Sequence, residues 1–291
     1  MHRLNADLAL LFAAAIWGTA FVFQKSAMDH VGPLTFVAAR CSLAALTLAP
    51  LAWLEARTAA EPVGRAFLAV AFWGGLAFFL GAWLQQTGMM TATVTNAGFL
   101  TALYVVITPF LAWGWSGKAP SRFVWPAAAL SALGTWLLGG GTLGAFSPGD
   151  RLVGFSAVLW AVHVVITGQA ALYRRPITFT AVQFAVVAVL AACGAGLLEA
   201  PTTAGLAAAA FDIAFVGLLS SALTFTLLTL ALQYTPPAEA AVIVSLETVF
   251  AAAAGYLLLG ERLTGLGICG AGLILLAILC IQIGPALAAR R

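Results

Sequence analysis

The feature that most constrains this chain is a run of 52 residues, 66–117, that contains no Asp, Glu, Lys or Arg. The hydrocarbon core of a bilayer is about 30 Å thick, and a helix needs about 20 apolar residues to cross it. The run is therefore too long for one crossing, and the Gly and Thr residues at 88–93 divide it into two. The pattern predicts a helical hairpin that crosses a membrane twice.

Charges are scarce along the whole chain of 291 residues, of which 63% are apolar and 8% are charged. Soluble domains are roughly 45–50% apolar and about a quarter charged, so this chain has too few charges to cover a soluble surface. The composition argues against a soluble enzyme, a nucleic-acid-binding protein and a disordered chain, and it predicts lipid as the surroundings. A net charge of +3 is too small to indicate a polyanionic partner.

Further charge-free stretches follow one another, separated by short segments that contain Pro and Gly. We predict ten transmembrane helices and no sizeable soluble domain. The first helix is preferred over a cleaved signal peptide because it is long and has a counterpart later in the chain. The expected ranges are 7–29, 33–54, 66–87, 93–115, 123–143, 152–173, 177–198, 211–233, 238–259 and 264–284.

The basic residues of the loops and termini predict how the helices are oriented. Nine of them fall on the side of the two chain ends, and only Arg151 and Arg262 fall on the other side. Lys and Arg are enriched in cytoplasmic loops. We therefore expect an integral protein of the cell (inner) membrane with both termini in the cytoplasm.

The chain also resembles itself when it is shifted by 143 residues. The shift places Pro33-Leu-Thr-Phe-Val-Ala38 on Pro176-Ile-Thr-Phe-Thr-Ala181, and it places Trp17 on Trp160. Ala and Leu coincide easily in such a sequence, but Pro, Trp and Thr-Phe at one constant shift indicate an internal repeat.

The repeat predicts an all-α membrane protein of two five-helix halves, residues 1–147 and 148–291, which form one membrane unit. Because five is odd, the halves are expected to enter the membrane in opposite orientations. Inverted repeats are typical of secondary transporters. Two similar folds that face opposite ways can exchange shapes, which opens a central cavity first to one side and then to the other.

Three segments carry a resemblance to a known family. They are Ile16-Trp17-Gly18-Thr19, the segment Thr91–Pro109, and Ser245-Leu246-Glu247 followed by Leu259-Gly260-Glu261-Arg262-Leu263. In this order and spacing, they resemble the EamA-type branch of the drug/metabolite transporter superfamily, in which YddG-like amino-acid exporters are one kind. The resemblance implies ten helices and export of amino acids or other small metabolites.

Two positions depart from the pattern of that family. Glu247-Thr248 stands where the family often has Glu-Pro, and Gly117-Lys118 stands in the first half where the second half has Gly-Glu. Neither departure affects the expected fold. The substrate does not follow from the resemblance, because proteins that share a fold differ in function.

Ionisable groups inside a membrane helix are informative because a central charge costs about 2.5–3.5 kcal/mol on insertion scales. Glu247 lies in the middle of the predicted ninth helix. Its carboxylate is interpreted as a partner for a substrate amine, as a proton site, or as a packing group bonded to a neighbour. Arg40 is a possible charge partner, which could meet a substrate carboxylate, meet Glu247, or extend toward the outer interface.

Asn96 and Tyr104 are eight residues apart and share one helical face, and the shift equates them with Glu239 and Glu247. This equivalence predicts a cavity between the two halves. The expected lining residues are Trp17, Gln86, Asn96, Tyr104, Trp160, His163, Thr224 and Glu247. Structural roles stay open for some of these residues. Trp17 and Trp160 could pack the core, and His163 could be a buried neutral histidine bonded to a neighbour. The Thr224 hydroxyl could form a hydrogen bond to the backbone.

The predicted function is a secondary transporter that exports small organic metabolites, with amino acids, including apolar and aromatic ones, as the first expectation. A multidrug or organic-cation exporter is the alternative. An enzyme is not expected, because the chain has no metal-binding cluster, usable His/Asp/Ser constellation or Gly-rich phosphate loop. The expected partners are a small solute and the lipid bilayer, without nucleic acid, metal or cofactor, and the oligomeric state stays open.

Overall fold

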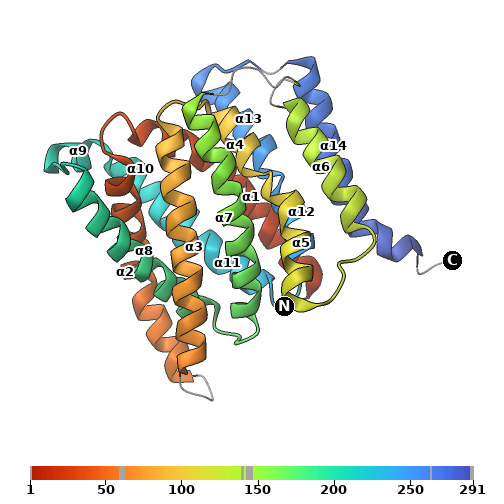
Figure 1. Ribbon diagram of the computed structural model, residues 1–291, viewed down its shortest axis with the longest axis horizontal. Helices are drawn as coiled ribbons and strands as arrows, with labels where there is room; N and C mark the ends of the chain where they lie inside the picture. The colour runs from red at the N-terminus through yellow and green to blue at the C-terminus, as the bar shows by residue number, and fades with distance from the viewer. Residues whose placement is uncertain (1, 59–62, 139–140, 142–146, 263, 289–291) are drawn as a thin grey trace.

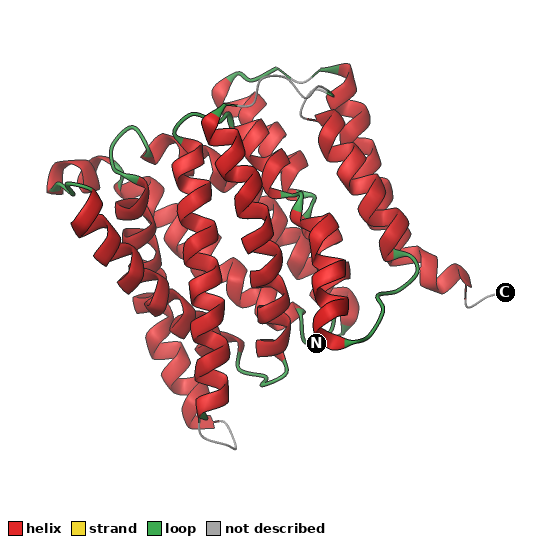
Figure 2. Ribbon diagram, viewed as in Figure 1, coloured by secondary structure: helices red, strands yellow, loops and turns green. Residues whose placement is uncertain are grey.

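The computed structural model describes residues 2–58, 63–138, 141, 147–262 and 264–288 (Figure 1). Over these residues the chain is helical, with no strand (Figure 2). Within the same residues, eight helices are long and apolar enough to cross a membrane. Two shorter apolar helices, Val124–Leu137 and Gly265–Ile281, complete ten. The prediction of an all-α membrane protein with ten crossings is confirmed.

The first half of the chain contains six helical elements, of which α4 and α5 form one crossing. They are α1 (Arg3–Ala27), α2 (Pro33–Thr58), α3 (Arg65–Met89), α4 (Val94–Thr101), α5 (Tyr104–Ser116) and α6 (Val124–Leu138).

The second half repeats this order, with short additional elements before and within its third crossing. Its elements are α7 (Pro148–Ala171), α8 (Pro176–Leu198), α9 (Thr203–Ala208), α10 (Ala210–Ala214), the π-helix η1 (Phe215–Leu223), α11 (Thr224–Ala231), α12 (Pro237–Val244), α13 (Glu247–Leu259) and α14 (Gly265–Ala288).

The helices of the two halves pack in a symmetric pattern. Equivalent helices pack on each other in the pairs α2–α8 and α6–α14, which lie at opposite edges of the bundle (Figure 1). Helix α3 packs on α7, and its counterparts η1 and α11 pack on α1, the counterpart of α7. In the same way, α1 packs on α13, and α7 packs on α4 and α5. Exchanging each helix for its counterpart reproduces the same neighbours, so the fold consists of two related halves.

Two carboxylates show that the related halves are inverted. Glu199, at the end of α8, accepts hydrogen bonds from the backbone N–H groups of Leu34 and Thr35 at the start of α2, both at 2.8 Å. Glu55, near the end of α2, accepts from the N–H groups at the start of α8, including that of Thr178 at 2.6 Å. Equivalent helices that cap each other's first turns must run antiparallel, so the repeats face opposite ways.

A third carboxylate accounts for the departure at Gly117-Lys118. Glu261 accepts from the backbone N–H groups of Val94 and Thr95 at 3.2 Å, and also from the Thr95 hydroxyl, at the start of α4. The equivalent helix α12 begins at Pro237, which has no N–H to donate. The second half therefore lacks one of the two backbone donors that a carboxylate in place of Lys118, the counterpart of Glu261, could cap.

The fourth crossing of each half is interrupted at the same place. Helix α4 ends at Thr101 and α5 begins at Tyr104, while α12 ends at Val244 and α13 begins at Glu247. At each interruption, backbone N–H groups bond to the carbonyl oxygen three residues earlier instead of four, as in a 3₁₀ turn. Discontinuous helices in transporters mark the site where the solute binds. The two interruptions place Tyr104 and Glu247 at the start of a half-helix.

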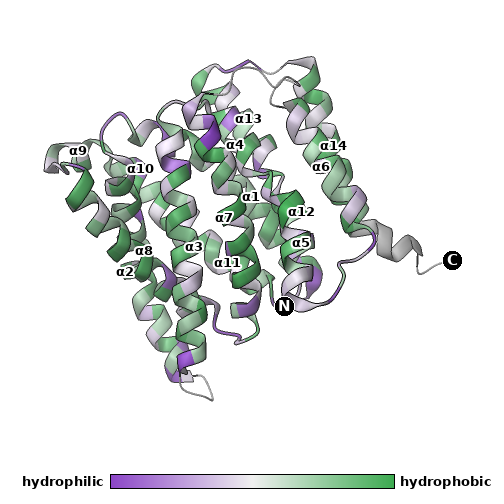
Figure 3. Ribbon diagram, in the orientation of Figure 1, coloured by the Kyte–Doolittle hydropathy of each residue, from purple (hydrophilic) through white to green (hydrophobic). Residues whose placement is uncertain are grey.

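The outer surface of the bundle is apolar. Large side chains such as Phe155 and Leu197 are 68% and 84% exposed. Hydrophobic residues extend along the helices, and most of the hydrophilic residues lie near helix ends and loops (Figure 3). This distribution suits helices that face lipid along their sides and water at their ends.

Candidate functional site

A cavity lies between the two halves, with walls from both. Its volume is about 70 Å³, which is enough space for several water molecules. The side chains with polar atoms that line it include Gln24, Arg40, Gln85, Thr101, Tyr104, His163, Ser220 and Glu247.

The structure brings together most, but not all, of the residues that the sequence indicates for this site. Six of them line the cavity, namely Trp17, Arg40, Tyr104, Trp160, His163 and Glu247. Gln86 instead donates to the backbone oxygen of Gln24 at 2.8 Å, and its neighbour Gln85 lines the wall. Thr224 donates to the oxygen of Ser220, one turn earlier, at 2.6 Å.

Glu247 and Tyr104 line the same cavity as equivalent residues of the two repeats. Glu247 is the first residue of α13 and is 4% exposed, and Tyr104 is the first residue of α5 and is 5% exposed. The Tyr104 hydroxyl lies next to the Glu247 side chain. The Oε1 atom of Glu247 has no partner among the described residues. The carboxylate therefore keeps an acceptor for a further donor.

Gly18 allows α1 to approach this carboxylate closely. A side chain at this position would place its first carbon 2.5 Å from the backbone oxygen of Glu247 and 2.7 Å from the backbone nitrogen of Ala251. Only glycine lets the two backbones come this near. Trp17, the residue before Gly18, lines the cavity, so this close approach lies beside the cavity wall.

Arg40 lies on the cavity wall from α2 and is 4% exposed. Its Nη1 atom donates to the Ser221 hydroxyl of η1 at 3.0 Å. The guanidinium carbon lies 5.5 Å from the centre of the Phe78 ring and 5.9 Å from that of Phe36, within the range of a cation–π interaction. Among the described residues, its Nε atom has no hydrogen-bond partner.

Aromatic rings form the apolar part of the wall. The Trp17 ring lies 4.8 Å from Phe225 and the Trp160 ring lies 5.0 Å from Phe78, measured between centroids. Trp17 donates its indole N–H to the Ser220 oxygen at 2.9 Å, and Trp160 donates to the Gln85 side chain at 2.6 Å. The two Trp side chains are thus both cavity wall and fixed packing elements.

His163 is fully buried beside this wall. Its Nε2 atom lies 2.9 Å from Gln183 Oε1, and its ring packs 5.4 Å from Phe78 and 5.6 Å from Phe225. Gln183 is the residue that the 143-residue shift equates with Arg40. The two equivalent positions therefore hold a neutral pair in one half and a charged side chain in the other.

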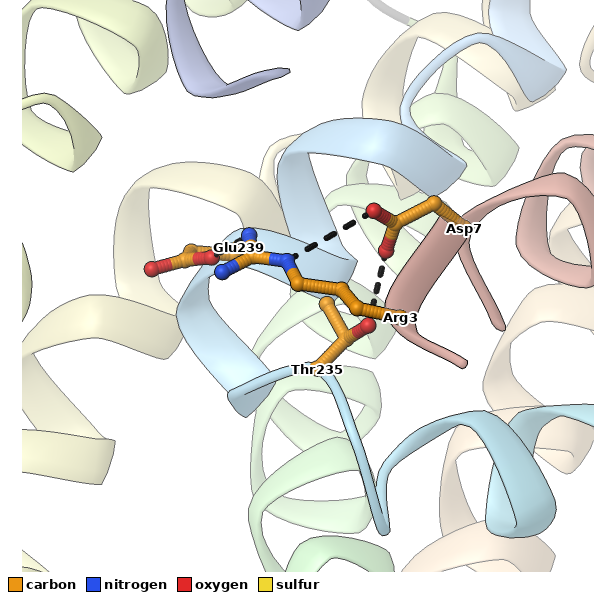
Figure 4. Close-up of polar contacts among 4 residues, drawn as sticks. All are labelled: Arg3, Asp7, Thr235 and Glu239. Carbon is orange, nitrogen blue, oxygen red and sulfur yellow. Dashed lines mark hydrogen bonds and ion pairs between the residues drawn. The ribbon is translucent and has the colours of Figure 1, made fainter. Parts of the chain in front are cut away.

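A polar cluster at one end of the bundle was not singled out by the sequence (Figure 4). Arg3 forms an ion pair with Glu239, and its Nε atom lies 3.6 Å from Asp7. The Thr235 hydroxyl donates to Asp7 at 2.7 Å. These four residues, here called the Arg3 cluster, join α1 to α12 and the preceding turn.

Asn96 belongs to the corresponding link at the other end of the bundle. Its side chain donates to Asp150 of α7 at 3.3 Å. The 143-residue shift equates Asp7 with Asp150 and Asn96 with Glu239. That coincidence of polar residues was the available sequence signal for both links. Asn96 lies outside the cavity lining, so the structure gives it a helix-linking contact instead.

Ten apolar helices in two inverted repeats, with a cavity at two interrupted helices, form the architecture of a membrane transporter. The model of the EamA-like transporter family matches residues 4–140 and, a second time, residues 147–283. The chain belongs to this family, which consists of transporters and not of enzymes.

Individual relatives agree with this assignment. An uncharacterized transporter of Archaeoglobus fulgidus is 31% identical over 97% of this chain and 87% of its own length. The threonine/homoserine exporter RhtA of Salmonella typhimurium is 30% identical over 60% of this chain and 58% of its own length. A solved crystal structure aligns over 98% of both chains with a TM-score of 0.78 and 18% identity, which shows a shared fold.

Proposed function

We propose that this protein is a secondary transporter that exports small organic metabolites, with amino acids as its substrates, by alternating access through the central cavity. The observation that carries this proposal is Glu247. It is a buried carboxylate with a free acceptor atom, at the start of a half-helix, on the wall of a cavity shared by the two halves. An ammonium group of a solute would supply the donor that the protein does not.

The remaining wall suits the other parts of such a solute. The rings of Trp17, Phe78, Trp160 and Phe225 offer an apolar surface for a side chain of the substrate. The similarity to an exporter named for threonine and homoserine, over 60% of this chain, supports amino acids as the class and export as the direction. The distribution of basic residues supports a cell (inner) membrane location with both termini in the cytoplasm.

Counterflow in liposomes tests the proposal directly. Vesicles with the purified protein are loaded with one unlabelled amino acid at a time, and entry of the labelled compound is followed. We expect counterflow for at least one amino acid, reduced about tenfold or more by Glu247→Gln and by Tyr104→Phe because each removes a polar contact from a desolvated site. The matched control is Tyr256→Phe, since Tyr256 is 54% exposed on the outer surface. Wild-type flux in the Glu247 and Tyr104 variants would contradict the proposed site.

An organic-cation exporter is the second candidate, and the same carboxylate favours it. Glu247 beside aromatic rings is also a suitable site for a cation that carries no carboxylate. Tetraphenylphosphonium in the same counterflow assay separates the candidates. Flux of this cation without flux of any amino acid would replace the first proposal with the second.

A further inference from the structure

We infer that Arg40 binds the carboxylate of the substrate, and that Arg40 and Glu247 together make the cavity selective for zwitterions. The inference rests on the proposed transport function and specifies the chemical class that the same cavity accepts. It also gives a reason why an amine without an acid group should be a poor substrate.

The first observation is that the cavity contains a basic and an acidic side chain that form no ion pair within the described residues. Arg40 and Glu247 both line it, and each is 4% exposed. Within the described part of the chain, the ion pairs closer than 4.0 Å are those of Arg3, so Arg40 and Glu247 form no ion pair with each other or with another charged side chain. Buried charges are ordinarily paired, because desolvation is costly. A ligand that carries both opposite charges would compensate both residues at once.

The second observation is how Arg40 is held. The Ser221 hydroxyl and the Phe78 ring fix the guanidinium, but both groups are neutral and leave its charge uncompensated. A guanidinium has five N–H donors, and the contact with Ser221 uses one of its nitrogens. Its planar donors match the two oxygens of a carboxylate. Arg40 is therefore oriented in advance and still has donors for an acid group.

The position of Arg40 also decides among the roles that the sequence left open for it. A side chain that extended to the membrane interface would be exposed at its tip, and Arg40 is buried. A partner of Glu247 would lie within ion-pair distance, and it does not. The carboxylate of a bound solute is the remaining role.

The third observation concerns two acceptor atoms on the cavity wall. Glu247 Oε1 and the Thr101 hydroxyl oxygen are buried, lack partners among the described residues, and line the same cavity. An ammonium group has three donors and needs several acceptors. The two oxygens provide acceptors for it, and the aromatic wall is available for a side chain.

The two repeats differ at the position of the charge. Gln183, the counterpart of Arg40, bonds to His163, so the equivalent position in the other half is neutral. Because only one of the two related positions carries a basic side chain, the two halves contribute different polar groups to the cavity. An inverted repeat by itself would not produce this difference.

Matched ligands that lack one charge test the inference. The probes are L-phenylalanine, L-phenylalaninamide, which has no carboxylate, and 3-phenylpropionate, which has no ammonium. A second set contains L-threonine, L-threoninamide and 3-hydroxybutyrate. Inhibition of counterflow in the liposomes described above is measured for each probe. We expect the wild type to prefer the amino acid over both partial ligands by about tenfold or more in at least one set.

The variants then assign each discrimination to one residue. Arg40→Gln should reduce the preference for amino acid over amide to about one, and Glu247→Gln should reduce the preference for amino acid over acid in the same way. These are ratios within one variant, which a general loss of folded protein would leave unchanged. Arg40→Lys should retain part of the preference over the amide because it keeps the charge. If Arg40→Gln does not fold, Ser221→Ala, which frees the guanidinium, should lower the same ratio.

The outcomes distinguish the two proposals. An Arg40→Gln protein that keeps the wild-type ratio of amino acid to amide would overturn the role of Arg40 and leave transport intact. A wild type that accepts the amides as well as the amino acids would overturn zwitterion selectivity. A wild type that moves no amino acid in the counterflow screen would overturn the proposed function itself.

Discussion

Arg3 and Glu239 form an ion pair that ties the start of α1 to the first turn of α12. The Arg3 cluster around this pair adds Asp7 and the hydroxyl of Thr235 (Figure 4). At the other end of the bundle, Asn96 of α4 donates to Asp150 of α7, and the Gly149 N–H of α7 donates to the Thr91 hydroxyl in the turn before α4 at 3.1 Å. Among the described residues, these equivalent positions therefore carry an ion pair at one end and hydrogen bonds without an ion pair at the other. The two ends of the cavity helices are thus held by different kinds of contact.

The first prediction is that Arg3→Gln makes the cavity easier to reach from the side of the Arg3 cluster. Arg3 is largely exposed, and such an ion pair is worth about 0.2–1 kcal/mol, enough to change a two-state population by up to about fivefold. The reporter is Ala240→Cys, a cavity position on α12, in a protein without its native cysteines. We expect its reaction with a maleimide added on that side to accelerate by a few fold.

Asn96→Ala in the same background is the matched control for this measurement, because it loosens the opposite end. It should leave the labelling rate from the side of the Arg3 cluster unchanged or lower. The double variant Arg3→Glu/Glu239→Arg, which restores a pair of opposite charges, should return the rate toward that of the parent. Equal rates in the parent and in Arg3→Gln would show that this pair does not hold the cavity closed.

The second prediction concerns Glu55 and Glu199, which cap the first turns of α8 and α2. Substituting either with Ala leaves backbone N–H groups without acceptors, and loss of a helix cap costs about 0.5–2 kcal/mol. We expect a lower midpoint of thermal unfolding in detergent for Glu199→Ala and for Glu55→Ala. Glu199 also accepts from the Thr35 hydroxyl at 2.6 Å, so its loss should be the larger.

The corresponding Gln variants give the control for charge. An amide oxygen still accepts a hydrogen bond but brings no negative charge to the positive end of a helix. Glu55→Gln and Glu199→Gln should therefore unfold at temperatures between those of the Ala variants and the wild type. Ala variants with the wild-type midpoint would argue against capping as the role of these carboxylates.

The third prediction is that Gly18→Ala both destabilises the protein and impairs transport. A methyl group there would contact the backbone of α13 at Glu247, and overpacking of this kind costs about 1–3 kcal/mol. Because the contact lies beside the cavity wall at Trp17 and Glu247, we expect counterflow to fall beyond what the loss of folded protein explains. Thermal unfolding and flux per folded protein are measured on the same sample.

Gly154→Ala provides the control for helix glycines. Gly154 lies inside α7, and nothing lies within 4 Å of the place where its side chain would be. Because glycine is about 0.5–1 kcal/mol less favourable than alanine within a helix, this substitution should be neutral or stabilising. A Gly18→Ala protein that behaves like Gly154→Ala would show that the close approach of α1 to α13 is not required.

Much of the fold could be predicted from local sequence because each crossing meets lipid by itself. Ranges such as 66–87 and 177–198 agree closely with α3 and α8. The predicted start of the first helix at residue 7 was late, since α1 begins at Arg3. Arg3 and Asp7 enter the helix because their charges meet partners on distant segments. The predicted end of the fifth helix, at residue 143, lies outside the described residues.

The candidate site could be predicted only in part. Tyr104 and Glu247 were found because repeat symmetry and helical spacing place them on equivalent faces, and both reach the cavity. Helical spacing does not resolve which of two adjacent glutamines turns inward, and the structure selects Gln85. It also does not reveal the interruptions before Tyr104 and Glu247, because these depend on how the half-helices pack against the other repeat.

The sequence by itself determined the membrane class, the ten crossings and the twofold repeat, because these follow from hydrophobicity and self-similarity along the chain. Only the tertiary structure decided which polar residues share a cavity. Arg40 and Glu247 are distant in sequence, and each lacks a counter-ion only because of the neighbours that folding gives it. A side chain's partners depend on the rotation and packing of whole helices, which no local pattern specifies.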